Sequence, residues 1–300
     1  MKVRASTVDG IFYPADRPAL AELVKGLLAG AGTAGAAECI ISPHASYDYS
    51  GAVAAAAFQS ASAREVRRVV LLGPVHREPA DRLLLPESEA FQTPLGNVPV
   101  DQETVDRLAG EDPCFAMDDI PHLEEHCLEV QLPFVQTLFP EALLVPVLMG
   151  RPTARLAEAL ARALQRALGP ELDRSLVAVS ANLTSYRPRE QAQEEARGLL
   201  ELIRAGDGQA LLEAAGRKLV SSCGAGCIAV ILALERGPRA QAEVLKLASS
   251  LPMSGDERKV VHYAAVAFER AKRGKAADIR GTQDPARGRA GGDRGTASRA

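Results

Sequence analysis

Two of the five histidines in this chain follow short aliphatic runs at matching places. One run leads into His44 through Ser42-Pro43, and another leads into His76 through Gly73-Pro74-Val75. In open α/β sheets, ligands bind at the carboxyl ends of strands, and a proline there ends the hydrogen-bonded ladder. Two imidazoles at adjacent strand ends have the chemistry to share a transition-metal cation. The alternative is a pair of surface or capping histidines, and spacing alone leaves both interpretations open.

A third candidate ligand is Cys223, which stands in Ser221-Ser222-Cys223-Gly224 just before an apolar helical pattern. A thiol near a helix N-terminus has a lowered pKa, which favours the thiolate and metal binding. The alternative is a buried structural cysteine. That is the role we predict for Cys39 and Cys227, because both fall inside apolar runs.

Residues 122–126 form a His-Leu-Glu-Glu-His segment, which matches a zinc-peptidase pattern. In that pattern His122 and His126 would bind zinc, and Glu125 would act as the general base. Pro121 argues against this interpretation, because the predicted helix then only begins at His122, which we expect to be exposed at a frayed end. We expect His126 to point inward from the apolar face of this helix, as a proton donor or as a satisfied core histidine.

Short aliphatic runs alternate with amphipathic helical patterns along most of the chain. Strands are predicted over residues 38–42, 67–73, 143–149, 175–180, 243–248 and 260–267. Helices are predicted over residues 18–29, 51–61, 101–109, 124–138, 154–168, 190–205 and 226–234. This alternation is typical of a mostly parallel sheet covered on both faces, and the last two strands, with no helix between them, predict an antiparallel edge. The predicted fold class is therefore a single-domain three-layer α/β/α protein with a mostly parallel mixed sheet.

The composition excludes several classes of protein. The chain is 47% hydrophobic and carries 35 basic and 38 acidic residues, so it has no overall basic surface for nucleic acid. Its apolar runs reach about eight residues, whereas a membrane helix needs about 20. Five cysteines are too few for a disulfide scaffold, and the N-terminus lacks the apolar segment of a secretory signal. We therefore expect a cytoplasmic protein without a membrane span.

Charge is distributed unevenly along the chain. Residues 271–300 hold eight Lys or Arg and three Asp, a net charge of +5, which leaves −8 for residues 1–270. Ile279 is the one large aliphatic residue of that C-terminal segment, so the segment cannot bury enough apolar surface to offset its ordering entropy. We predict one α/β domain over 1–270 and a disordered basic tail over 271–300.

A series of short motifs stands in a fixed order along the chain. They are GIFYPAD at 10–16, PHASYDYSG at 43–51, LGPVH at 72–76, TPLG at 93–96, EHCLEVQLPF at 125–134, CG at 223–224 and SGD at 254–256. Their number and order together are highly specific. With these motifs the chain resembles the MEMO family, which includes the bacterial AmmeMemoRadiSam system protein B, from about residue 4 to residue 269.

The resemblance implies a fold like that of the class III extradiol dioxygenases, with a metal-site cleft at strand ends. It carries the metal ligands of the family, two histidines and one cysteine, onto His44, His76 and Cys223, and a histidine near the cleft onto His126. It favours iron or copper. Two imidazoles and a thiolate also suit zinc but not Mg²⁺ or Ca²⁺, and three protein ligands leave an open position.

The chain departs from the family pattern in the loop after the strand at 175–180. The resemblance leads us to expect an aspartate and a histidine there, but the residues are Asn182 and Ser185. Asparagine cannot supply the charge of a carboxylate, and serine cannot act as an imidazole acid or base. Proton transfer would then depend on His126, or on water held by Ser185 and Thr184. Because a thiolate stands where ring-cleaving dioxygenases use a carboxylate on iron, we do not predict catechol cleavage.

Two functions from different classes follow. The first is a metal-dependent redox or modification component that uses His126 as proton donor. The resemblance implies that it acts with a radical-SAM protein and an AMMECR-type protein, on an unknown small molecule or peptide. The alternative is a non-enzymatic scaffold whose cleft binds a metal or a peptide.

Overall fold

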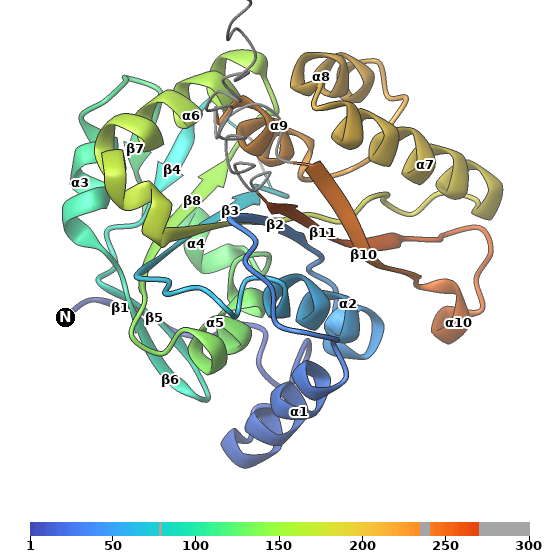
Figure 1. The fold of residues 1–300 in the computed structure, drawn as a ribbon, viewed down its shortest axis with the longest axis horizontal. Helices are drawn as coiled ribbons and strands as arrows, with labels where there is room; N and C mark the ends of the chain where they lie inside the picture. The colour runs from blue at the N-terminus through green and yellow to red at the C-terminus, as the bar shows by residue number, and fades with distance from the viewer. Residues whose placement is uncertain (78–79, 235–240, 270–300) are drawn as a thin grey trace, which may run out of the picture.

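The computed structural model describes residues 1–77, 80–234 and 241–269, with an eight-stranded mixed sheet at its centre (Figure 1). In spatial order its strands are β10 (Gln241–Ser249), β11 (His262–Glu269), β2 (Cys39–Ser42), β9 (Ser175–Ser180), β3 (Arg68–Pro74), β8 (Leu143–Met149), β4 (Leu83–Leu85) and β7 (Phe115–Met117). The central strands β2, β9, β3 and β8 are parallel, and β11 and β10 form an antiparallel edge. The predicted antiparallel edge is therefore confirmed.

Helices cover both faces of this sheet (Figure 1). One layer contains α1 (Arg17–Ala29), α2 (Tyr47–Gln59) and α5 (Leu132–Leu138). The other contains α3 (Gln102–Ala109), α6 (Ala154–Leu168), α7 (Arg189–Ala205), α8 (Gly208–Gly216) and α9 (Ala225–Ala233). Because every strand of the parallel centre is buried between helices, these strands are nearly continuous apolar runs. The prediction of an α/β protein with a mostly parallel mixed sheet is confirmed, while its likeness to extradiol dioxygenases stays a prediction.

The prediction of one continuous helix over residues 124–138 is wrong. Helix α4 (Asp119–Glu124) ends where Glu125 adopts an extended backbone, and a short 3₁₀ turn at Glu129–Gln131 leads into α5. Pro133 lies in the first turn of α5, where its missing N–H costs nothing, whereas inside a longer helix it would break a hydrogen bond. This interruption brings the segment from Glu125 to Gln131 to the edge of the sheet where β2 and β3 end.

A second, small sheet was not expected from the sequence. It pairs β1 (Val3–Arg4) with β5 (Ala90–Thr93) in parallel and β5 with β6 (Gly96–Pro99) in antiparallel orientation. The short strands β4 and β7 and the helix α8 were also missed. The missed strands have only two to four residues, which carry too little periodicity to be recognised from sequence alone.

No helix of the described residues is long and apolar enough to cross a membrane. Cys39 and Cys227 are buried in the core, as predicted. The predicted tail over 271–300 lies outside the described residues.

Candidate metal centre

Two strand ends and one helix start meet at the candidate site. His44 follows β2, His76 follows β3, and Cys223 precedes the first turn of α9. The sequence led us to expect that the two strands before these histidines are direct neighbours. That expectation is wrong, because β9 lies between them and ends at Ser180. All three strands are parallel, so their carboxyl ends still open onto one edge of the sheet.

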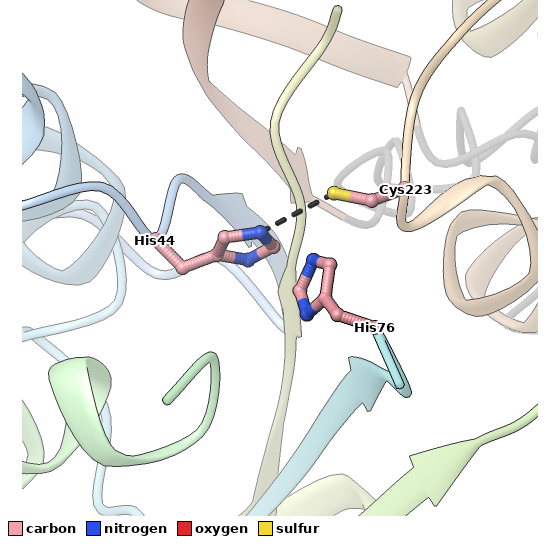
Figure 2. A group of neighbouring side chains, drawn as sticks. All are labelled: His44, His76 and Cys223. Atoms are coloured by element: carbon pink, nitrogen blue, oxygen red, sulfur yellow. Dashed lines mark hydrogen bonds between the residues drawn. The ribbon is translucent and has the colours of Figure 1, made fainter. Parts of the chain in front are cut away.

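The three candidate ligands point toward one another (Figure 2). The Sγ atom of Cys223 lies 3.2 Å from Nε2 of His44. The centroids of the His44 and His76 rings are 5.2 Å apart, and the ring planes are nearly perpendicular. One potential ligand atom from each of the three residues lies within 4.8 Å of the others. The sequence therefore identified a group of side chains that the fold does bring together.

Polar side chains contact the Nδ1 atom of both imidazole rings. His44 Nδ1 lies 2.9 Å from the hydroxyl of Ser180, at the end of β9. His76 Nδ1 lies 2.8 Å from a carboxylate oxygen of Glu125, and the other oxygen of Glu125 accepts the backbone N–H of His76. Glu125 is only 3% exposed, so its carboxylate is committed to these contacts.

The start of α9 packs directly on the end of β9. A Cβ atom on Gly224, the N-cap of α9, would overlap the side chain of Ala181. A larger residue at position 224 could not approach the strand as closely. The missing side chain of Gly224 thus allows the preceding Cys223 to reach the two histidines.

The surroundings of the candidate ligands shift the pKa values of Cys223 and His76. Burial alone would raise the pKa of Cys223, but the charges and hydrogen bonds of His44 and His76 lower it to about 5. Burial alone would lower the pKa of His76, but contact with Cys223 and Glu125 raises it to about 10. The neighbouring imidazoles, more than the helix terminus expected from the sequence, thus favour the thiolate, which is the form that binds metals.

A second group of potential ligand atoms consists of His76, Glu125 and Cys127. Here the thiol of Cys127 is buried and donates a hydrogen bond to the carbonyl oxygen of Pro74, at 3.3 Å. Burial raises the pKa of Cys127 well above its usual value. A buried protonated thiol is a poor metal ligand, so the group with Cys223 has the better donor set.

His126 faces the same cleft. Its ring stacks on His76 at a centroid distance of 5.1 Å and lies edge-on to His44 at 5.5 Å. Burial and then the neighbouring charges of His44 and His76 lower the pKa of His126 to about 4. The ring is therefore neutral near pH 7, and it points toward the cleft as predicted, although α4 has ended before it.

His122 does not join this group. It is 1% exposed, and its Nε2–H donates to the carbonyl oxygen of Leu84 at 3.1 Å. The expectation of an exposed, frayed histidine is wrong, because α4 begins at Asp119 and Pro121 fits within its first turn. Among the described residues neither group of potential metal ligands contains His122, so the zinc-peptidase arrangement is not formed.

A cleft of about 640 Å³ opens in front of the three ligands. Aromatic side chains line much of it, and its cationic side chain, other than the histidines, is Lys259. The lining residues of the described chain include no carboxylate. The aromatic members are Phe12, Tyr49, Tyr186 and Tyr263.

Residues 4–267 match the model of the Memo-like protein family. The chain belongs to this family. A MEMO1 family protein from Methanopyrus kandleri is 35% identical over 283 residues, covering 89% of this chain and 99% of that protein. A MEMO1 family protein from a Thermotoga species is 32% identical over 281 residues, covering 88% and 99%. An uncharacterized Escherichia coli protein of solved structure aligns with a TM-score of 0.45 at 14% identity, covering 71% of this chain and 91% of that one.

Asn182 and Ser185, the two residues that we expect to depart from the family pattern, have different surroundings. Asn182 accepts the backbone N–H of His44 through Oδ1, at 3.1 Å, so its amide supports the ligand loop. Ser185 lines the cleft. Thr184, expected to hold a water beside Ser185, is instead fully buried and accepts the backbone N–H of His262. That part of the expectation is wrong, because Thr184 ties the loop to β11.

Sequence reasoning missed the residues behind the ligands of this MEMO-family site. The sequence analysis considered Glu125 only as the general base of the peptidase pattern, and Ser180 only as the last residue of a predicted strand. Gln131, which is fully buried and contacts Ser180, carried no local signal. The one available hint was the presence of a polar residue inside an otherwise apolar stretch, because a buried polar side chain is usually hydrogen-bonded.

Proposed function

We propose that this MEMO-family protein binds one transition-metal ion through His44, His76 and Cys223. The observation that carries the proposal is the convergence of two imidazoles and a thiol, from three separate segments, within 4.8 Å. Iron or copper is favoured and zinc would also fit, because this borderline-soft donor set does not suit Mg²⁺ or Ca²⁺.

The chemistry of the ligand set fits such an ion. A bound iron or copper ion would supply redox chemistry, and its three protein ligands would leave a coordination position open. The chain itself would bind a small molecule or peptide against the aromatic lining and orient it toward the ligands. His126 would exchange a proton with that ligand, since its ring lines the cleft and stacks on His76.

We infer that the protein is a redox or modification component that acts with a radical-SAM protein and an AMMECR-type protein. This part of the proposal is supported by family membership. Its substrate is an unknown small molecule or peptide. A count of five cysteines in 300 residues, too few for a disulfide scaffold, supports a cytoplasmic location.

The alternative is a non-enzymatic scaffold that binds a metal or a peptide in the same cleft. Asn182 and Ser185 favour it, because neither can replace the aspartate and histidine that the resemblance leads us to expect. Oxygen consumption or a radical signal in the presence of the radical-SAM protein would support the redox component. Partner binding that survives His126→Ala, without either signal, would support the scaffold.

The metal content of untagged protein tests the proposal directly. The protein is purified, analysed for metals, and reloaded with Fe(II), Cu(I) or Zn(II) under reducing conditions. We expect about one equivalent, lost in His44→Ala and Cys223→Ala but retained in the control Cys127→Ala. Metal loss in Cys127→Ala with Cys223→Ala unaffected would assign the ion to the second group. A wild-type protein that takes up none of the three ions would overturn the proposal.

A further inference from the structure

Each candidate histidine ligand has a polar partner at Nδ1, as described above. We propose that Ser180 and Glu125 are positioning residues that keep a hydrogen on Nδ1 of His44 and His76 and so leave Nε2 of each ring to bind a metal. The metal-binding part of this inference rests on the proposed function. The position of the ring hydrogen, however, can be measured without any metal.

For His44 the argument begins at the amide of Gln131. One atom of this amide lies 2.8 Å from the carbonyl oxygen of Pro43, which can only accept, so that atom must be the nitrogen. The amide oxygen then accepts the hydroxyl of Ser42, at 2.8 Å. The same nitrogen also donates to the hydroxyl oxygen of Ser180, at 2.9 Å.

The hydroxyl of Ser180 has one hydrogen and two lone pairs. Its oxygen lies 2.6 Å from the carbonyl oxygen of Cys127, which can only accept, so the hydrogen of Ser180 is used there. One lone pair accepts from Gln131, and the other faces Nδ1 of His44 at 2.9 Å. Nδ1 of His44 must therefore carry a hydrogen, and Nε2, 3.2 Å from Cys223, is the ring nitrogen left to bind a metal.

For His76 the argument is shorter. A buried carboxylate has no hydrogen to give, so Nδ1 of His76 is the donor to Glu125. The second oxygen of Glu125 accepts the backbone N–H of the same residue, which fixes ring and backbone together. The backbone oxygen of Glu125 in turn accepts from the buried guanidinium of Arg4, at 2.8 Å.

The two positioning residues differ in charge. Carboxylate partners raise the basicity of ligating histidines, and removing such a partner typically costs about 10- to 100-fold in metal affinity. Ser180 is neutral, so it sets the orientation of His44 without adding charge. We therefore expect Glu125 to matter for affinity and tautomer, and Ser180 mainly for tautomer.

The ring-hydrogen experiment uses metal-free protein with ¹⁵N-labelled histidine. Long-range ¹H–¹⁵N spectra are recorded about two pH units above the ordinary imidazole pKa of about 6.5. We expect His44 with its hydrogen on Nδ1 in the wild type, and a mixture of tautomers in Ser180→Ala. A wild-type His44 ring with a hydrogen on Nε2 alone, or a Ser180→Ala variant with an unchanged spectrum, would overturn the inference for His44.

The affinity experiment uses Zn(II) in competition with a chromophoric chelator. We expect Glu125→Ala to bind zinc about 10- to 100-fold more weakly, with partial recovery in Glu125→Gln, which keeps one acceptor oxygen. The matched control is Glu124→Ala, because Glu124 is the neighbouring glutamate and is exposed. Thermal unfolding of each variant separates loss of the fold from loss of the ligand geometry.

The outcomes are distinguishable from failure of the proposed function. A wild-type protein that binds no zinc, iron or copper removes the metal site, while the spectra of His44 still decide the tautomer. If the wild type binds zinc but folded Glu125→Ala binds it within about twofold of the wild type, Glu125 is not a positioning residue. If Glu124→Ala weakens binding as much as Glu125→Ala, the effect is general electrostatics and the inference also fails.

Discussion

At the scale of single residues, Glu129 shows how the N-terminal segment is attached to the domain. Arg4 is 1% exposed and Glu129 is not exposed at all, and the two form an ion pair. The hydroxyl of Tyr13 donates to Glu129 at 2.6 Å, and Arg4 also donates to the carbonyl oxygen of His122 at 2.8 Å. Such a buried charge is tolerated only when every lone pair and hydrogen has a partner.

We therefore predict that Glu129→Gln lowers the free energy of unfolding by about 3 to 5 kcal/mol, because it leaves the Arg4 guanidinium buried without a counter-charge. Urea unfolding of both proteins measures the difference. The double variant Arg4→Met/Glu129→Gln should recover part of the loss. A change below about 1 kcal/mol for the single variant would mean that the pair is hydrated in solution.

His122 makes a pH-dependent contribution to stability. Burial lowers its pKa to about 4, from an ordinary value of 6.5. As the pH falls from 6.5 to 4, the unfolded chain binds a proton at this site and the folded protein does not, so the folded state loses stability in that window and no further below it. The difference between the two pKa values corresponds to about 3 kcal/mol.

The variant His122→Gln keeps a donor for the carbonyl of Leu84 but cannot titrate. We predict that the difference in unfolding free energy between variant and wild type changes between pH 6.5 and 4 and is constant above pH 7.5. Measuring the difference removes the contribution of the carboxylates, which titrate in both proteins. Parallel pH profiles for the two proteins would show that His122 does not titrate as described.

At the scale of elements, the contact between α9 and β9 controls the position of Cys223. We predict that Gly224→Ala lowers the free energy of unfolding by about 1 to 3 kcal/mol, because a Cβ there overlaps Ala181. It should also weaken metal binding, because relief of the overlap moves the start of α9 away from His44.

The matched control is Gly198→Ala in the middle of α7. A Cβ at this position would meet nothing within 4 Å, so the substitution should stabilise the protein by about 0.5 to 1 kcal/mol and leave metal binding unchanged. Chemical unfolding and metal titration of both variants test the pair. Equal effects of the two substitutions would contradict the packing argument.

The sequence predicts elements well where periodicity is long. Helix α6 occupies the residues predicted for it, and β8 and β9 match their predicted runs, because long amphipathic or buried segments carry a clear pattern. The prediction for the segment from Glu125 to Gln131 was wrong because tertiary contacts determine its backbone conformation. Its polar side chains reach Arg4, Ser42 and His76, and no local pattern encodes such partners.

The residues of the candidate site also fall into a group that the sequence indicated and a group that it did not. Strand-end spacing drew attention to His44 and His76, and a helix start drew attention to Cys223. Their partners Ser180 and Glu125 were not identified as such. Ser180 contacts a residue 136 positions away, and the order of the strands, which puts β9 between β2 and β3, is not written in any local motif.

At the scale of the whole molecule, we predict that a bound metal raises the melting temperature. The three ligands join the ends of β2 and β3 to the start of α9, so an ion bound only by the folded state stabilises all three. At a free metal concentration of about 100 times Kd the gain is about 2.7 kcal/mol, or several degrees. Differential scanning calorimetry with and without Zn(II) measures it, and Cys223→Ala should show no shift.

We also predict that deletion of residues 271–300 leaves the melting temperature within about 2 °C of the full chain. The segment contains one large aliphatic residue, and the described core ends with β11. Calorimetry of the shortened chain tests this. A large decrease would show that the C-terminal segment contributes to the fold.

The insertion of β9 between β2 and β3 sets an order of events during synthesis. Residues 39–76 leave the ribosome early, but the sheet that holds both histidine ends in place needs a strand that arrives about a hundred residues later. Cys223 follows later still, 179 positions after His44. A metal ion therefore cannot nucleate this fold from a short nascent segment, since closing such distant contacts comes late in folding. The proposed metal site would therefore be loaded only after β9 and Cys223 have been synthesised, as a step in the maturation of the folded protein.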